Sequence, residues 1–181
     1  MTFYKRNSEV MPQFILKINS PADTVYDDEK IVCYAADAAL PDSLLAKLNS
    51  GSRMLLLAGP DAAKRCKELN ADGILAPLDP SKPVKAQLEK QQAAAGKNAV
   101  VVPVIPPRRH EAMLASETEP PFVAFAVTPA NREAVFPVLK WYNDLFLIQS
   151  AVDLTAGAVE LSGLDADFVI INSADYADFS C

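Results

Sequence analysis

The chain has 181 residues, of which half are apolar and 22% are charged, and its formal net charge is −6. This length and composition fit one folded domain over residues 1–181 that opens with a polar segment, residues 1–13, and they exclude a chain that is disordered throughout. The acidic balance excludes a nucleic-acid partner, because phosphate-backbone binding requires clustered Lys and Arg.

Eight short apolar runs recur along the chain, and each is rich in Val, Ile, Leu or Phe. Their apolar character is nearly continuous instead of alternating, which is typical of strands that are buried on both faces of a parallel sheet. In chain order, the predicted strands are residues 14–18, 31–35, 54–58, 73–76, 100–105, 122–127, 145–148 and 168–171.

Segments with helical start and stop signals lie between most of these runs. Pro41 stands at a first helical position with Asp42 in the first turn, Gly96 follows a strongly helix-forming stretch, and Thr128 is the expected N-cap of another helix. The predicted helices are residues 41–48, 60–70, 82–95, 128–141 and 154–161.

Alternation of strands and helices predicts an α/β fold of right-handed βαβ units, and eight such units favour a small (β/α)₈ TIM barrel. A typical barrel of this kind takes about 250 residues, so this one must be smaller, with some of its helices shortened or missing. Residues 20–30 are too short and polar for a full helix, and residues 174–181 are too few for a closing one. The alternative is an open doubly wound sheet. Pro103, Pro106 and Pro107 predict a fifth strand that is short or bulged.

The cysteine and histidine content points to a reduced, cytoplasmic protein. Cys33, Cys66 and Cys181 form no CxxC pair, so we expect free thiols. A single histidine excludes a His-rich metal site. No continuous apolar run reaches the length of a membrane span, so we expect no membrane partner.

Two stretches resemble a known family. Residues 67–75 read KELNADGIL before the fourth predicted strand, and residues 164–171 read LDADFVII into the eighth. Both are similar to the Ala-Asp-Gly entries of the thiamine phosphate synthase and thiazole tautomerase (TenI-like) family of small barrels. Residues 100–112 and 122–125 also resemble that family's fifth and sixth units. The resemblance implies a TIM barrel with a phosphate-binding site and, in the family's enzymes, synthase or tautomerase activity.

The chain departs from the family at three strand ends. Its second strand ends at Asp37, where the family carries a basic pair for pyrophosphate. After the third strand it has Gly59, Pro60 and Asp61 in place of an Asn-Asp-Arg motif for magnesium and substrate. Gln149 starts the stretch that replaces a phosphate-gripping Gly-Gly pair. These departures indicate a chain without synthase activity.

Three acidic residues follow the second, third and fourth predicted strands. In a barrel the functional groups gather at the carboxyl ends of the strands, so Asp37, Asp61 and Asp79 could converge. Carboxylate oxygens suit Mg²⁺, which makes magnesium the one cofactor to consider. The alternative is structural: Asp61 stands in a helix first turn, and Asp79 forms a turn.

Basic and polar groups follow the later strands. Arg108 and Arg109 could clamp a phosphate or carboxylate, and His110 could act as a general acid or base; the alternative is a solvated helix start. Asp61 and His110 are the two candidate catalytic residues. Thr128, Asn131 and Arg132 would form an anion site at a helix N-terminus, or a plain capped helix. Further candidates for ligand contacts at strand ends are Gln149, Asn172 and Ser173, together with Asn19, Asp153 and Asp175.

These residues favour a divergent, non-synthase barrel of that family that binds a phosphorylated or anionic small molecule. One alternative is an active thiamine phosphate synthase or thiazole tautomerase. Another is a non-catalytic structural protein, whose outer strands, lacking a full closing helix, expose apolar surface and drive self-association into a homo-oligomer.

Overall fold

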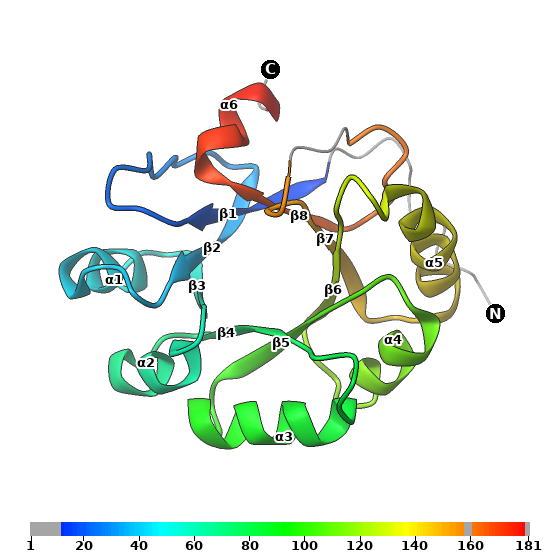
Figure 1. Ribbon diagram of the computed structural model, residues 1–181. Helices are drawn as coiled ribbons and strands as arrows, with labels where there is room; N and C mark the ends of the chain where they lie inside the picture. The colour runs from blue at the N-terminus through cyan, green and yellow to red at the C-terminus, as the bar shows by residue number, and fades with distance from the viewer. Residues whose placement is uncertain (1–11, 158–160, 180–181) are drawn as a thin grey trace.

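The computed structural model describes residues 12–157 and 161–179 and shows a closed barrel of eight strands in chain order (Figure 1). All neighbouring strands pair in parallel, and β8 returns to pair with β1. The closure confirms the predicted (β/α)₈ barrel and excludes the open doubly wound sheet. The strands are β1 (Gln13–Ile18), β2 (Ile31–Asp37), β3 (Met54–Ala58), β4 (Gly73–Pro77), β5 (Val100–Ile105), β6 (Phe122–Ala126), β7 (Gln149–Asp153) and β8 (Phe168–Asn172).

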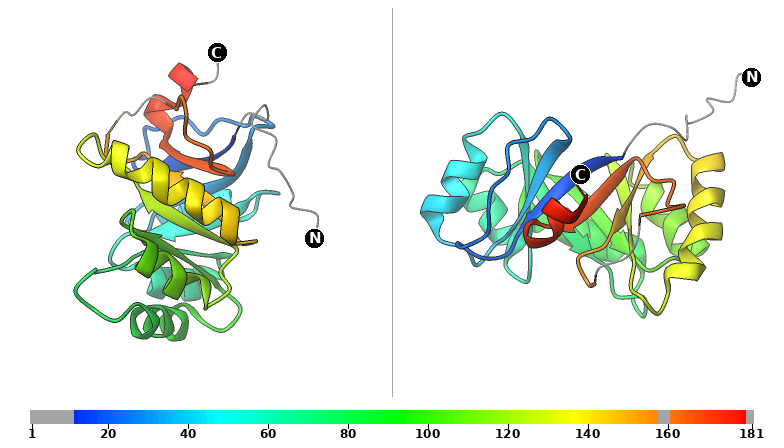
Figure 2. Two further views of the ribbon diagram at one scale, coloured as in Figure 1. Left: turned by 90° about the vertical axis from the view of Figure 1, so that its right-hand side faces the viewer. Right: turned by 90° about the horizontal axis from the view of Figure 1, so that it is seen from above.

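The helices lie outside the barrel, as the views along and across it show (Figures 1 and 2). The helices predicted at residues 41–48, 60–70 and 82–95 are confirmed to within two residues at each end. The fifth strand is neither short nor bulged, although it pairs with β6 only through Val104 and Ile105. The helices are α1 (Asp42–Asn49), α2 (Ala62–Leu69), α3 (Val84–Ala95), α4 (Arg109–Ser116), α5 (Arg132–Leu145), the 3₁₀ turn η1 (Ser173–Asp175) and α6 (Tyr176–Phe179).

The seventh strand was predicted in the wrong place. Residues 145–148 are apolar, but Leu145 ends α5, and Leu145 and Leu147 are 65% and 100% exposed. The strand is the less apolar segment Gln149–Asp153, whose Ser150 is fully buried. Ser150 can be buried because its hydroxyl donates to the Asn143 side chain at 2.8 Å. Because this strand contains a buried polar residue with a hydrogen-bond partner, hydrophobicity alone does not identify it.

Two predicted helix features are also wrong. The fifth helix begins at Arg132 with Asn131 as its N-cap residue, so Thr128 is not the N-cap. Residues 154–157 form a turn, whereas a helix was expected over residues 154–161; residues 158–160 of that prediction lie outside the described part of the chain.

The outer face of β1 is covered without a full helix on either side of it. Phe14 of β1 is fully buried and meets the ring of Tyr176 edge-on at 5.5 Å, and Tyr176 also contacts Tyr26 of the β1–β2 loop at 5.0 Å. The Tyr34 hydroxyl donates to the Tyr26 carbonyl at 2.8 Å and holds that loop in place. Among the described residues, these rings cover β1, and the outward-facing side chains of this strand, Phe14, Leu16 and Ile18, are fully buried.

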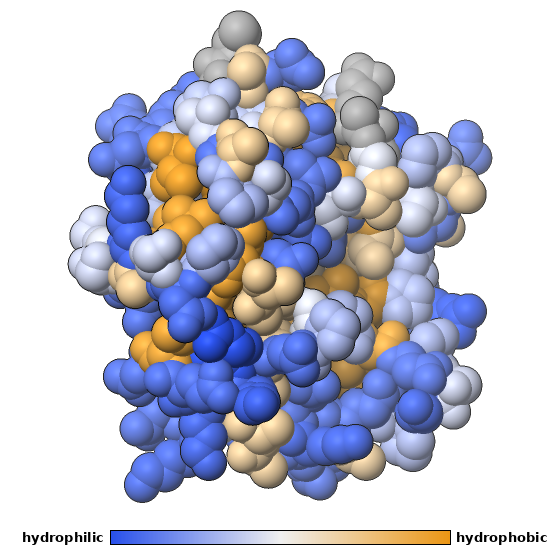
Figure 3. Space-filling view, turned by 60° about the vertical axis from the view of Figure 1, so that its left-hand side comes forward, coloured by the Kyte–Doolittle hydropathy of each residue, from blue (hydrophilic) through white to orange (hydrophobic). Residues whose placement is uncertain are grey.

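The large hydrophobic side chains that are exposed among the described residues lie elsewhere. They are Met54, Met113, Leu145 and Leu147. On the side of the molecule drawn in Figure 3, hydrophobic residues show in patches bordered by hydrophilic ones. None of the described helices is long and apolar enough to cross a bilayer.

The barrel interior is a separate apolar core built in layers. Side chains alternate along each strand, and the inward-facing ones form their own cluster. When the pairing is followed around the barrel and the strand tilt is included, alternate strands contribute layers of four residues, as in other TIM barrels. Two central layers are Ile15, Leu56, Val102 and Ala151, followed by Ala35, Leu75, Ala124 and Ile170.

Cys33 lies in this interior, and we expect it to limit stability in alkali. Burial, with a smaller effect of the Asp72 carboxylate, raises the pKa of Cys33 from 9.0 to about 12. The unfolded thiol ionises first, so the free energy of unfolding should fall as pH rises from 9 towards 12, by up to about 1.4 kcal/mol per pH unit for this group. Urea unfolding over that range should show a shallower fall for Cys33→Ala. Equal slopes for both proteins would contradict the prediction.

Candidate functional site

We call one end of the barrel the mouth. It consists of the two layers of inward-facing residues that lie nearest the carboxyl ends of the strands. Lys17 lies two residues beyond Ile15 on β1, and Asp153 two beyond Ala151 on β7, so both face inward. The same alternation places Asp37 and Asn172 inward on β2 and β8. The lower layer is Lys17, Ala58, Val104 and Asp153, and the upper is Asp37, Pro77, Ala126 and Asn172.

The mouth is divided into a polar and an apolar half. Strands β7, β8, β1 and β2 contribute all four of its polar side chains, whereas β3 to β6 contribute two alanines, a valine and a proline. Adjacent strands lie about 4.8 Å apart, so the polar groups are neighbours in space. A ligand at this end of the barrel would find all its charged contacts on one side.

Hydrogen bonds fix the β7 and β8 members of the polar half. One oxygen of Asp153, Oδ1, accepts the Thr155 hydroxyl at 2.6 Å and the Thr155 backbone N–H at 3.0 Å. The Asn172 amide donates to the Thr155 carbonyl at 3.1 Å, and its Oδ1 accepts from Asn19 at 2.8 Å. These contacts tie three strand ends together and orient both side chains.

Among the residues that the structure describes, Lys17 is the one inward-facing cation of the mouth. It is partly exposed, and it pairs across the sheet with Asn172. Its ammonium makes no ion pair with a carboxylate anywhere in the described residues. Asp37, on the next strand, uses one oxygen to accept the Ala39 N–H at 2.8 Å. Counting contacts within residues 12–157 and 161–179, the mouth thus presents one ammonium without an ion pair and two carboxylates that each accept through a single oxygen.

The three predicted magnesium ligands do not form a metal site. The described residues contain no group of three or more His, Cys, Asp or Glu that could hold a metal ion. Asp37 faces the mouth, Asp61 is exposed before α2 without a capping bond, and Asp79 belongs to a loop. The structural alternative holds for Asp79, whereas Asp61 is the residue before α2 and does not stand in its first turn.

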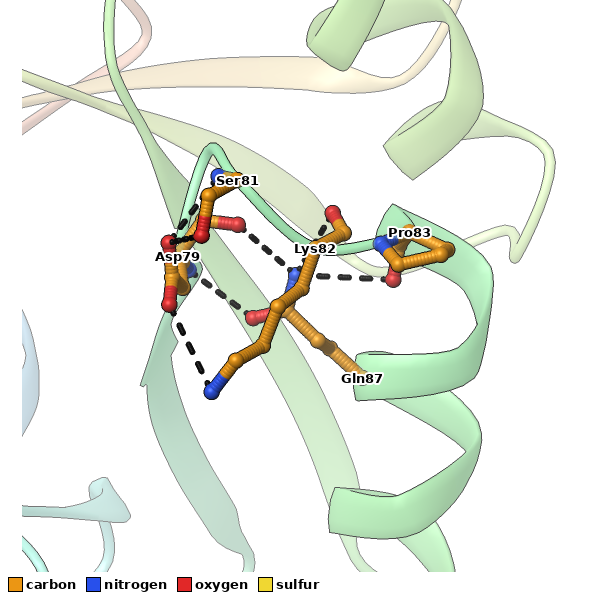
Figure 4. A network of polar contacts seen from close by, with 5 residues as sticks. All are labelled: Asp79, Ser81, Lys82, Pro83 and Gln87. Atoms are coloured by element: carbon orange, nitrogen blue, oxygen red, sulfur yellow. Dashed lines mark hydrogen bonds and ion pairs between the residues drawn. The ribbon is translucent and has the colours of Figure 1, made fainter.

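Asp79 organises the loop between β4 and α3 (Figure 4). Its carboxylate accepts the Ser81 hydroxyl at 2.6 Å and the Ser81 N–H at 2.9 Å, and it pairs with Lys82 at 3.4 Å. These bonds, those from Ser81 first, lower the pKa of Asp79. Gln87 of α3 closes the loop by accepting from the Asp79 N–H and donating to the Asp79 carbonyl. Asp79 is therefore a turn former.

The basic residues after β5 are exposed or bonded to groups of the outer helices. Arg108 is 61% exposed and pairs with Glu111 at 3.5 Å. The Arg109 guanidinium lies over the ring of Trp141 on α5, at 5.2 Å. His110 is exposed on the first turn of α4. Arg108 and His110 thus match the solvated helix start, and Arg109 is engaged between two outer helices.

The predicted anion site before α5 is mostly occupied by its own bonds. Thr128 N–H donates to Asn131 Oδ1 at 2.8 Å, and Asn131 N–H donates to Thr128 Oγ1 at 3.2 Å. Asn131 also donates to the Ala126 carbonyl. Arg132 lies over Phe136 at 4.9 Å and donates to the Ser162 carbonyl at 3.1 Å. The side chains of this turn are mostly bonded within the chain, so they have few hydrogen-bonding groups left for a ligand.

Two other predicted contacts lie outside the mouth. Gln149 begins β7 and pairs with Phe122 at the start of β6, so it is at the opposite end of the barrel. Ser173 is buried, and its hydroxyl donates to the Thr24 carbonyl of the β1–β2 loop. Gln149 was misplaced because the seventh strand was predicted at residues 145–148, directly before the observed strand Gln149–Asp153.

Lys17 is the functional candidate that sequence reasoning missed. Charged residues are almost never buried unless they are paired, and Lys17 interrupts the otherwise apolar run of β1. The available signal was its two-residue spacing from Ile15, which assigns both to one face of the strand. Only barrel closure shows that this face is the interior and that the position is at the mouth.

Two of the motifs that carry the family resemblance have a structural role at the amino-terminal ends of the strands, opposite the mouth. Asp72 precedes β4, and its carboxylate accepts the N–H of Leu55 in β3 at 2.8 Å. Asp167 precedes β8, and its carboxylate accepts the N–H of Ser150 in β7 at 2.8 Å. In both places the pairing of the two strands begins one residue after this contact. The carboxylate therefore adds one hydrogen bond ahead of the backbone pairing.

Removing either carboxylate should destabilise the fold. Asp72→Ala and Asp167→Ala each leave a buried backbone N–H without its acceptor, which costs about 1–3 kcal/mol. Urea unfolding at neutral pH measures the loss. Asp165→Ala, an exposed neighbour, should stay within about 0.5 kcal/mol of wild type. Losses no larger than that control would contradict the assigned role.

The resemblance therefore rests on elements that build a barrel, and the residues at its mouth differ from the family's. Ala58 and Asp37 stand at strand ends where that family carries a metal-and-substrate motif and a basic pair. Comparison of the chain with protein-family models and with the sequences of curated proteins gives no match.

Proposed function

We propose that the chain is a divergent thiamine phosphate synthase-like barrel that binds a phosphorylated or otherwise anionic small molecule at its mouth and lacks synthase activity. The observation that carries the proposal is Lys17, an ammonium on the inner face of the barrel with no ion-pair partner in the described residues. The free thiols of Cys33 and Cys66 are consistent with a cytoplasmic protein.

An ammonium in this position favours an anion for a physical reason. It lies above apolar layers that contain Ile15, Ala35 and Ile170, so it is partly removed from water. Attraction between opposite charges grows as the surroundings become less polar. A phosphate or carboxylate that enters the mouth would gain charge-assisted hydrogen bonds from the three N–H groups of Lys17.

The lack of synthase activity is argued from the strand ends. Asp37 would repel a pyrophosphate where the family has a basic pair, and after β3 the Asn-Asp-Arg motif is replaced by Gly59, Pro60 and Asp61, of which only Asp61 has a side-chain ligand for magnesium. We expect purified protein with magnesium to form no thiamine phosphate from the pyrimidine pyrophosphate and the thiazole phosphate. Formation of product above a no-protein control would contradict this part of the proposal.

Calorimetric titration with inorganic phosphate and pyrophosphate tests the binding site. Loss of a charged hydrogen bond costs about 1.5–3 kcal/mol. Lys17→Gln should therefore lower the affinity for whichever anion binds wild type more tightly by at least about tenfold. Lys97→Gln is the matched control, because Lys97 is exposed beyond α3, at the other end of the barrel. Equal affinities for wild type and both variants, or no binding by wild type, would overturn the proposal.

A further inference from the structure

The polar half of the mouth carries more negative than positive charge. Lys17 contributes one positive charge, and Asp37 and Asp153 contribute two negative charges. At the rim, Asp175 lies 3.4 Å from the Asn172 amide, and Asp23 accepts the backbone N–H groups of Asn19 and Ser20. A ligand with an anionic group alone would satisfy Lys17 and be repelled by the carboxylates.

Each inward-facing carboxylate also has an acceptor to spare. Asp153 and Asp37 accept hydrogen bonds through Oδ1, and within the described residues their Oδ2 atoms have no protein donor. A carboxylate can accept up to about four hydrogen bonds. The site therefore offers acceptors that a positively charged donor on the ligand would fill.

We infer that the ligand of the mouth is a zwitterion, a short amine that also carries a phosphate or carboxylate. This inference rests on the proposed function, since it takes the anion of the ligand to bind Lys17. The ammonium of the ligand binds Asp153, with Asp37 as a second acceptor. Both charges of the ligand then meet an opposite charge, so the ammonium offsets the repulsion that an anion alone would meet from the carboxylates.

The barrel geometry suits two opposite charges a few bonds apart. Lys17 and Asp153 lie in one layer on β1 and β7, with β8 between them. Two strand spacings separate their backbones by roughly 10 Å, and both side chains face the barrel interior. A short chain between amine and anion therefore keeps the two charges of the ligand within reach of both groups. The apolar half of the mouth offers neither charge a partner.

The test compares 2-aminoethyl phosphate with ethyl phosphate by calorimetry at one pH and one salt concentration. The two probes share the phosphate and differ by the ammonium. We expect wild type to bind 2-aminoethyl phosphate about tenfold more tightly, which corresponds to about 1.4 kcal/mol. Asp153→Asn keeps the Oδ1 acceptor for Thr155 and should bring the ratio of the two affinities close to one. Asp37→Asn is the second variant and should lower the ratio in part.

A matched control and the alternative outcomes make the test decisive. Asp61→Asn replaces an exposed carboxylate before α2 with an amide, and it should leave the ratio of the two affinities unchanged. If wild type binds both phosphates equally and Lys17→Gln weakens both, the zwitterion inference is overturned and anion binding stands. If neither phosphate binds wild type, both proposals are overturned. Circular dichroism spectra that match wild type show that each variant is folded.

Discussion

Gly73→Ala is expected to destabilise the protein by at least about 4 kcal/mol, the range reached by severe core changes. A Cβ at position 73 would overlap the carbonyl oxygen and a side-chain methyl of Val100, far inside van der Waals contact. Gly73 begins β4 and pairs with Val100 at the start of β5, so the two backbones cannot separate without opening the barrel. Urea unfolding, or the soluble yield if the variant does not fold, measures the effect.

Gly51→Ala is the control for that substitution. A Cβ at position 51 would lie 3.4 Å from the Leu48 carbonyl oxygen, with no overlap. Gly51 follows α1 at the surface, and we expect a change within about 1 kcal/mol. Unfolding of Gly73→Ala at the same urea concentration as Gly51→Ala would show that the strand contact at position 73 is looser than the structure has it.

Tyr176→Ala is expected to cost about 3–5 kcal/mol, as other large aromatic truncations in cores do. Tyr176 is almost fully buried and lies against both Phe14 and Tyr26. Since no helix covers β1 on the β1–β2 side, loss of this ring would expose the strand to water. Thermal and urea unfolding measure the change.

Tyr176→Phe separates the ring from its hydroxyl. Burial, followed by the nearby Asp28 carboxylate, raises the pKa of Tyr176 to about 12. The unfolded tyrosine ionises near pH 10, so this group contributes stability below that pH and loses it as pH rises towards 12. Tyr176→Phe should retain most of the stability at neutral pH and unfold less readily in alkali. A loss as large as that of Tyr176→Ala would assign the stabilisation to the hydroxyl.

Seven of the eight strands could be predicted from the sequence because both faces of each are buried and apolar. β7 could not, since Ser150 is buried through its bond to Asn143, while the more apolar residues Leu145 and Leu147 are exposed. The cover of β1 by Tyr26 and Tyr176 joins residues far apart in the chain. No local pattern encodes such a contact.

The site was less predictable than the fold. Reading strand ends identified Asp37, Asp153 and Asn172, which do face the mouth, yet it also selected Arg109 and Arg132, whose guanidinium groups lie on the aromatic rings of Trp141 and Phe136. The direction of a long side chain depends on its neighbours in the fold. Lys17 was missed because it lies within a strand and not after one.

Backbone amide spectra recorded during a phosphate titration test most directly whether the mouth binds an anion through Lys17. The account predicts progressive shifts at Lys17, Asp37, Asp153 and Asn172, and none of comparable size at Lys97 or Gln149, at the end of the barrel opposite the mouth. It also predicts that these shifts disappear in Lys17→Gln. Shifts that are confined to the starts of α4 and α5, or that persist unchanged in that variant, would contradict it.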